Sequence, residues 1–171
     1  MIEDKNLDFN KIASACNVWR NYDDIVFSWA SVLSIIDFFA KYQDLYVEIH
    51  GPGQWFDPDM IIVGNNGLSY EQMKAQMAIW AIWSAPLFMS NDLRTITREE
   101  KQILTNKHVI QIDQDDEGIF GRRVIKERNF EVWLKPLSPV TIRDVDHWQY
   151  AVVYFNRATL GTATYVSSRI R

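Results

Sequence analysis

The segment Ile12-Ala-Ser-Ala-Cys-Asn-Val-Trp-Arg-Asn-Tyr-Asp-Asp24 runs from mostly apolar residues into a polar loop that carries two carboxylates. Residues 12–19 predict a buried strand, and the loop would follow at its carboxyl end. Apolar residues then recur at three- and four-residue spacing, which predicts one apolar face of a helix. These residues are Trp29, Val32, Leu33, Ile36, Phe39 and Ala40. The segment therefore predicts a strand–loop–helix unit with polar side chains in its loop.

A second unit of the same kind follows. Residues 45–49 predict a strand, and the glycine- and proline-rich residues 51–59 predict the loop after it. Ser69 with Gln72 three residues later has the pattern of a capping box, which predicts a helix that extends to about Trp83.

The third unit begins at Pro86. Residues 86–89 predict its strand, and Thr97 with Glu100 predicts a capped helix to about Asn106. Strands that alternate with helices imply a parallel sheet, and in a (β/α)₈ barrel the active site lies at the strands' carboxyl ends. A complete barrel takes about 250 residues, so three units predict only part of one.

The last third of the sequence has a different pattern. Residues 109–112, 130–134 and 150–155 predict strands separated by turns, which is typical of an all-β module. We therefore predict two regions, a partial α/β barrel over residues 1–106 and an incomplete antiparallel β domain over residues 107–171.

Composition excludes several classes of protein. A net charge of −4 over 171 residues gives no reason to expect a nucleic-acid partner. No run of 18 apolar residues predicts a membrane span, and the polar first twenty residues predict no secretory signal peptide in this sequence. The three histidines and one cysteine lack the spacing of a metal site, and no pattern predicts a cofactor.

Two segments combine carboxylates with aromatic residues at predicted strand exits. They are residues 19–24 and residues 51–60. Carboxylates perform acid/base and nucleophilic chemistry on glycosidic bonds, and aromatic faces pack against sugar rings. The combination indicates a candidate carbohydrate site.

Ten motifs occur in the order found in one known family. They are Cys16-Asn-Val-Trp-Arg-Asn-Tyr-Asp-Asp24, Ser28-Trp29, Ser34-Ile-Ile-Asp37, Gly51-Pro-Gly53, Asp57-Pro-Asp-Met60, Gly64-Asn65, Gln76-Met-Ala78, Ala85-Pro-Leu87, Met89-Ser-Asn-Asp-Leu-Arg94 and Ile112-Asp-Gln-Asp115. Over about residues 12–135 the sequence resembles the lysosomal α-galactosidase and α-N-acetylgalactosaminidase family of melibiase-like retaining glycosidases.

The resemblance implies an architecture. The family has a (β/α)₈ barrel followed by an antiparallel β domain, so this chain would supply the last three barrel units and the start of the β domain. The nucleophilic Asp and the cysteine that pairs with Cys16 would lie upstream of this sequence. The parent enzyme would be a lysosomal or secreted homodimer that acts on α-galactosyl or α-N-acetylgalactosaminyl glycoconjugates.

The resemblance also assigns roles in the first loop. Asp24 aligns with the general acid/base, and the alternative from the residues alone is a helix N-cap. Asp23 is the more natural cap of the two. Arg20 aligns with a substrate-binding arginine, and its alternative is a structural salt bridge.

In the second loop, Asp59 and Met60 align with residues of the pocket floor. The alternative for Asp59 is a loop carboxylate that caps backbone amides. Trp19 is assigned to the sugar pocket or to packing, and Trp55 is predicted to pack. Two departures from the family are Phe27, which replaces a common Asp, and Phe56, which replaces a common Asn.

Two functions from different classes remain open at this point. The first is a glycoside hydrolase that removes terminal α-linked galactose or N-acetylgalactosamine, here without its nucleophile and inactive alone. The second is a non-catalytic sugar-binding or interaction protein derived from the same family.

Overall fold

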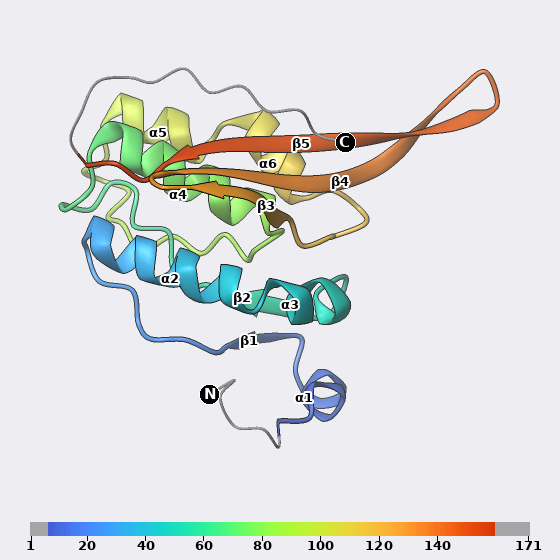
Figure 1. Ribbon diagram of the computed structural model, residues 1–171. Coiled ribbons are helices and arrows are strands. Elements are labelled where there is room, and N and C mark those ends of the chain that lie inside the picture. The colour runs from blue at the N-terminus through green and yellow to red at the C-terminus, as the bar shows by residue number, and fades with distance from the viewer. Residues whose placement is uncertain (1–6, 160–171) are drawn as a thin grey trace.

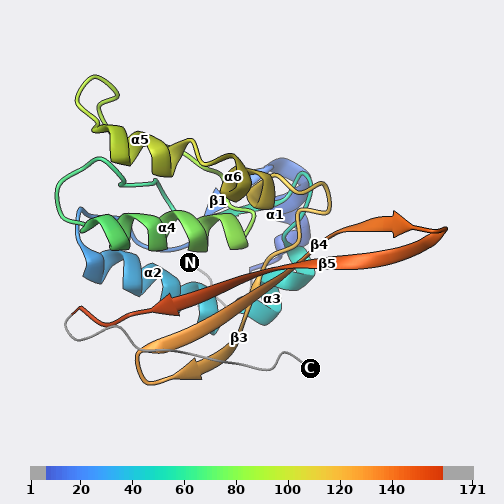
Figure 2. The same cartoon turned by 90° about the horizontal axis from the view of Figure 1, so that it is seen from above.

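Helices and a three-stranded sheet make up most of the computed structural model, which describes residues 7–159. The β4–β5 hairpin crosses the helices, and its turn extends beyond them (Figures 1 and 2). In chain order the elements are α1 (Phe9–Ala15), β1 (Val18–Arg20), α2 (Trp29–Lys41), α3 (Gln43–Ile49), β2 (Trp55–Asp57), α4 (Tyr70–Ile82), α5 (Arg98–Leu104), α6 (Lys107–Asp113), β3 (Arg122–Glu127), β4 (Phe130–Ile142) and β5 (Val145–Asn156).

The first part of the chain contains parallel pairing, as predicted. β1 and β2 are parallel, and Arg20 lies opposite Asp57 at their carboxyl ends. Further along, Ile61 forms a parallel bridge with Met89. The bridge has two hydrogen bonds, from the Ile61 amide to the Phe88 carbonyl at 2.7 Å and from the Ser90 amide to the Ile61 carbonyl at 3.2 Å. The parallel strands are three residues long or shorter, so loops carry much of this region.

Two of the predicted strands are wrong, and a third is right only at its end. Of residues 12–19, the first four belong to α1 and the last two lie in β1. Residues 45–49 belong to α3, and residues 109–112 belong to α6. A short apolar run fits a strand and a buried helix equally well, so periodicity alone did not separate them. The overlooked signals are N-caps: the Asp8 carboxylate accepts from two backbone amides of α1, and the Asn106 side chain accepts from two of α6.

The other elements follow their local signals. α4 and α5 begin with the predicted capping boxes at Ser69 and Thr97. The predicted third strand, residues 86–89, reduces to the single bridge at Met89. The second parallel strand is β2, which lies inside the predicted loop rather than at residues 45–49.

The last part of the described chain is an antiparallel sheet in the order β3–β4–β5, as the all-β pattern predicted. β4 is longer than predicted because Pro136 and Pro139 lie within it and do not end it. β5 is longer than predicted because it pairs with β4 out to Ile142 and Val145. The register shifts between Leu137 and Val140, and an irregularity of this kind accommodates a residue without an amide hydrogen. β3 was not predicted.

One aromatic core joins the helices to the sheet. The rings of Phe39 and Trp83 are 4.7 Å apart between their centroids, and Trp83 lies 5.8 Å from Phe120. Trp83 also meets Trp133 of β4 edge to face at 5.6 Å. All four side chains are at most 1% exposed, so α2, α4 and β4 share this core.

A buried ion cluster connects the sheet to α2. Glu131 of β4 is fully buried, and its Oε1 accepts from Arg157 at 2.7 Å and from Arg123 at 3.1 Å. Its Oε2 accepts from the Trp133 indole at 2.9 Å. Arg157 also makes a bidentate pair with Asp37 of α2, at 2.7 and 2.6 Å. Since the buried carboxylate uses both oxygens on charged or N–H donors, its desolvation is offset.

We expect Glu131→Gln to lower the free energy of unfolding by about 3–5 kcal/mol, because two arginines would lose their buried counter-charge. Urea unfolding followed by circular dichroism measures the change. Glu127→Gln is the matched control, since Glu127 is exposed at the end of β3. An equal effect of both substitutions on the free energy of unfolding would show that the buried cluster stabilises the fold no more than an exposed carboxylate does.

Candidate active site

The polar residues of the two acidic segments converge at the carboxyl ends of β1 and β2. Arg20 is the last residue of β1, and Asp57 is the last residue of β2. The parallel register places these two residues opposite each other. Asp24 and Asp59 lie in the loops that follow. The carboxyl ends of parallel strands share one edge of a sheet, which is where α/β proteins place ligand sites.

Arg20 is the centre of this cluster. Its Nη2 donates to Asp24 Oδ1, and its Nη1 lies 3.0 Å from Asp59 Oδ2. The hydrogen bond with Asp24, together with the charges of Asp59, Asp24 and Asp57, raises the pKa of Arg20 above its ordinary value, although partial burial opposes this. One guanidinium therefore bridges the carboxylates of the two loops.

Asp59 fixes the loops around the arginine. Its side chain is largely buried; Oδ2 accepts from the Ile25 amide at 2.8 Å and Oδ1 from the Met60 amide at 2.8 Å. Its carbonyl accepts from the Trp80 indole at 2.8 Å. Its φ of 76° is in the left-handed region, which Asp tolerates better than most residues. The amide-capping interpretation of Asp59 is thus confirmed, and an ion pair with Arg20 accompanies it.

Asp57 is a member of this cluster that the sequence did not single out. Its Oδ1 accepts from the Asp59 amide at 2.8 Å. Burial is the main cause that raises the pKa of Asp57, and the charge of Asp59 adds to it. The signal that could have found it is the strand register, because Asp57 lies opposite Arg20.

Asp24 differs from the other carboxylates because it is open to solvent. Its side chain is 82% exposed, and Arg20 is its hydrogen-bond partner among the described residues. The helix-cap interpretations of Asp23 and Asp24 are wrong, since α2 begins at Trp29 and its N-cap is Ser28. An exposed ion pair stabilises a fold by at most about 1 kcal/mol, so stability is a poor reason for this arrangement.

The apolar residues assigned to the site lie deeper. Trp19 is half-buried and meets Phe56 edge to face at 5.3 Å. Phe56 is fully buried and stacks on Tyr46 at 4.1 Å. The half-buried Met60 holds the Gln76 side chain through its carbonyl at 3.2 Å. The replacement at Phe56 is thus part of the core.

Phe27 lies at the surface in the loop between Asp24 and α2. Its side chain is 55% exposed, and its carbonyl packs directly against Gly67. Gly67 has a φ of 120°, a conformation that residues with a Cβ rarely adopt. The loop that carries Asp24 is therefore supported by a glycine from the segment before α4.

Other features bear on the class of site. Among residues 7–159, no group of three or more metal-ligating side chains is placed to hold an ion. None of the helices described is long and apolar enough to cross a bilayer. Cys16 is exposed, with no disulfide inside the described part of the chain.

The chain is similar to known glycosidases in sequence and in fold. The sequence profile described as Alpha galactosidase A matches residues 1–115. Alpha-N-acetylgalactosaminidase of Gallus gallus is 52% identical over 154 residues, which are 90% of this chain and 36% of that protein. Alpha-galactosidase A of Homo sapiens is 46% identical over 154 residues, 90% of this chain and 34% of its own length. The crystal structure of α-galactosidase I from Mortierella vinacea superposes with a TM-score of 0.69 at 26% identity, over 75% of this chain and 36% of that chain.

The mixed helix–strand fold and the similarity to these proteins make the chain a relative of the glycoside hydrolases. The profile covers more than half of the chain, which belongs to the α-galactosidase A family. The chain spans about a third of the length of these relatives.

We expect Gly67→Ala to destabilise the fold by roughly 1–3 kcal/mol, because its Cβ would lie 1.9 Å from the Phe27 carbonyl oxygen. Chemical denaturation measures the loss. Gly51→Ala is the matched control, since a Cβ there meets no atom within 4 Å. Equal stability of the two variants would mean that the Asp24 loop does not rest on Gly67.

Proposed function

We propose that this chain supplies part of the active site of a retaining glycoside hydrolase that removes terminal α-linked galactose or N-acetylgalactosamine from glycolipids or glycoproteins. The observation that carries the proposal is the exposed Asp24 carboxylate held by Arg20 at the carboxyl ends of β1 and β2. The names and identities of the relatives from Gallus gallus and Homo sapiens support the substrate class.

Asp24 would act as the general acid/base. A retaining reaction needs a carboxyl group that protonates the leaving oxygen and later takes a proton from water. Asp24 is accessible to a substrate, and Arg20 restrains its position. Arg20, Asp59, Met60 and Trp19 would then line the sugar pocket, with the guanidinium also available to sugar hydroxyls.

The nucleophile would come from elsewhere in the complete protein. Both oxygens of Asp59 accept backbone amides, and one also pairs with Arg20, so Asp59 is poorly disposed to attack a sugar. Residues 1–106 would be the last three units of a barrel and residues 107–171 the start of a β domain, and the finding that the chain spans about a third of the length of its relatives supports a partial barrel. Cys16 would pair with a cysteine outside this sequence, in a lysosomal or secreted homodimer.

The chain by itself should not hydrolyse 4-nitrophenyl α-galactoside or its N-acetylgalactosaminide, because no glycosyl intermediate forms without a nucleophile. Release of nitrophenol from the purified chain measures this. Turnover that persists through purification would overturn this expectation and would show that a carboxylate of this chain supplies the nucleophile.

The acid/base role is tested in a hybrid in which this chain replaces the matching segment of the Gallus gallus relative. Asp24→Asn should reduce hydrolysis of an unactivated alkyl glycoside by about 10²–10⁴-fold and of the nitrophenyl glycoside much less, since a good leaving group needs little protonation. Asp23→Asn is the matched control. Asp23 is an exposed neighbour, and its carboxylate makes no hydrogen bond or ion pair with the described residues.

Two outcomes of the hybrid experiment decide against the assignment. A hybrid with Asp24→Asn that keeps full rate on both glycosides would remove Asp24 from the chemistry. A folded hybrid that binds sugar but never turns it over, with or without the substitution, would instead favour a non-catalytic sugar-binding protein.

A further inference from the structure

A cavity of about 390 Å³ lies at the other ends of the two parallel strands, beside their first residues, Val18 and Trp55. One part of its wall is apolar and comes from β1, β2 and the segments before β2 and after α4. This part consists of Val18, Pro52, Trp55, Ala85 and Pro86. The other part is polar and consists of Ser84, Asp113, Gln114, Asp115 and Asp116.

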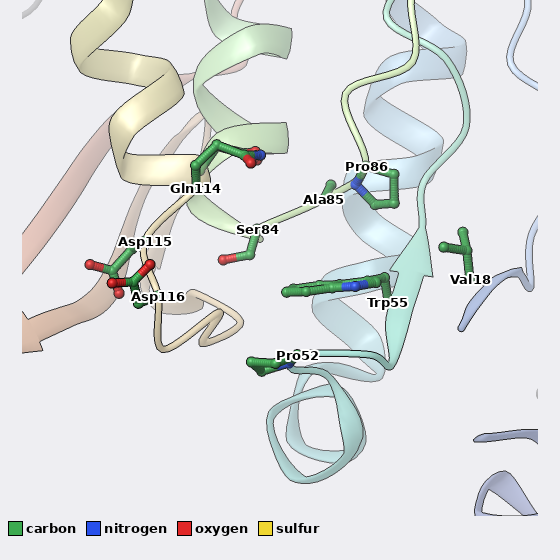
Figure 3. A pocket seen from close by; sticks show the side chains of 10 residues that line it. Val18, Pro52, Trp55, Ser84, Ala85, Pro86, Gln114, Asp115 and Asp116 are labelled. Atoms are coloured by element: carbon green, nitrogen blue, oxygen red, sulfur yellow. The ribbon is translucent and has the colours of Figure 1, made fainter. Parts of the chain in front are cut away.

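Trp55 presents its ring to this cavity and does not simply pack in the core. Figure 3 shows the indole extending from β2 between Pro52 and Pro86, with Asp115 and Asp116 across from its tip. His50 meets the ring edge to face at 5.1 Å. At the six-membered ring of the indole, a Cβ at Gly118 would lie 2.8 Å from Trp55 Cη2, so a glycine there allows the close approach. The ring is therefore braced in one orientation while it remains half-exposed.

The polar wall offers hydrogen-bond acceptors. Asp113 is only 3% exposed, and its Oδ1 has no partner among the described residues. Gln114 donates its Nε2 to Asp113 Oδ2 at 2.5 Å, which leaves Gln114 Oε1 as an acceptor. Asp116 is exposed at the mouth of the cavity, where its carboxylate can only accept when ionised.

The remaining polar groups of the wall are already engaged. The Ser84 hydroxyl accepts from Lys135 at 2.6 Å and donates to the Ile119 carbonyl at 3.2 Å. Both oxygens of Asp115 accept from the Ser138 amide, at 3.0 and 2.9 Å. Within the described lining, the side-chain donors available to a ligand are the Trp55 indole N–H and the second N–H of the Gln114 amide, and free acceptors outnumber them.

The charge of the wall is negative. Lys135 is fully buried behind Ser84 and also donates to the Ile112 carbonyl, so its ammonium does not line the cavity. Burial raises the pKa of Asp113 to about 7, and burial lowers the pKa of Lys135 to about 8. Three carboxyl groups around one hidden ammonium leave an excess of negative charge at neutral pH.

We propose that this cavity binds an organic ammonium ion, with its apolar part on the Trp55 face and its –NH₃⁺ group directed to Asp113, Gln114 and Asp116. An ammonium carries three donors and no acceptor, which matches a wall whose free acceptors outnumber its free donors. An aromatic face next to the cation adds a further attraction. A neutral sugar fits less well, because its hydroxyl oxygens also need donors. The inference is independent of the proposed glycosidase activity.

Isothermal titration of the chain with phenethylammonium chloride tests the proposal, with phenethyl alcohol as the neutral analogue and galactose as the sugar. We expect saturable one-to-one binding of the ammonium and at least about tenfold weaker binding of the other two. Binding should weaken with added salt, because part of the attraction comes from partly exposed charges. Equal affinity for the alcohol, or tighter binding of galactose, would overturn the proposal.

Asp116→Asn should weaken ammonium binding about fivefold or more. Asp116 is exposed, so we expect the substitution to leave the fold intact. Glu117→Gln is the matched control, since Glu117 is the exposed next residue and does not line the cavity. Trp55→Leu, checked for its fold by circular dichroism, removes the aromatic face and should weaken binding further. An ammonium affinity unchanged in Asp116→Asn and Trp55→Leu would place the binding elsewhere and refute the site.

Discussion

The buried Glu131 carboxylate, held by Arg123, Arg157 and the Trp133 indole, is the contact on which the arrangement of the chain depends. Two parallel strands of three residues cannot form a core by themselves, so the antiparallel sheet must supply a second wall. Arg157 donates to Asp37 of α2 as well as to Glu131, and so it holds α2 against that sheet. α2 begins just after the loop of Asp24, and its first residue, Trp29, packs on Phe155 of β5 at 5.8 Å.

A second arginine-centred cluster uses the same chemistry with a different degree of burial. Around Glu131, carboxylate oxygens are fully enclosed and engaged, which favours a fixed structure. Around Arg20, Asp59 is enclosed and tied to backbone amides, whereas Asp24 is open to solvent. The inner carboxylate stabilises the loops, and the outer one stays accessible. Burial, and not residue type, therefore separates the structural acid from the one to which we propose to assign the chemistry.

The sequence predicted features that depend on local signals. The capping boxes at Ser69 and Thr97 mark true helix starts, because the cap and its partner are three residues apart. The predicted strand at residues 45–49 was wrong because a seven-residue helix and a buried strand can have the same apolar content. The parallel order of the strands predicted that Asp24 and Asp59 lie close together. It did not predict the place of Asp57, which depends on strand register. Nor did it predict the cavity beside Trp55, whose polar wall comes from residues 113–116, far along the chain.

The alternation of side chains in β1 and β2 explains how so short a sheet contributes residues to a cavity at one end and to the carboxylate cluster at the other. Trp19 and Phe56 are the middle residues, and they point to one face, where their rings meet at 5.3 Å. The first and last residues point to the opposite face, which places Val18 and Trp55 at the cavity and Arg20 and Asp57 at the carboxylate cluster. A shift of the strand pairing by one residue would turn Arg20 toward the core and Trp19 toward solvent. Burial of the arginine charge would destabilise the fold, and strands of three residues have no other contacts to offset it. The aromatic pair in the middle therefore fixes the register, and that register determines which residues are available at each end.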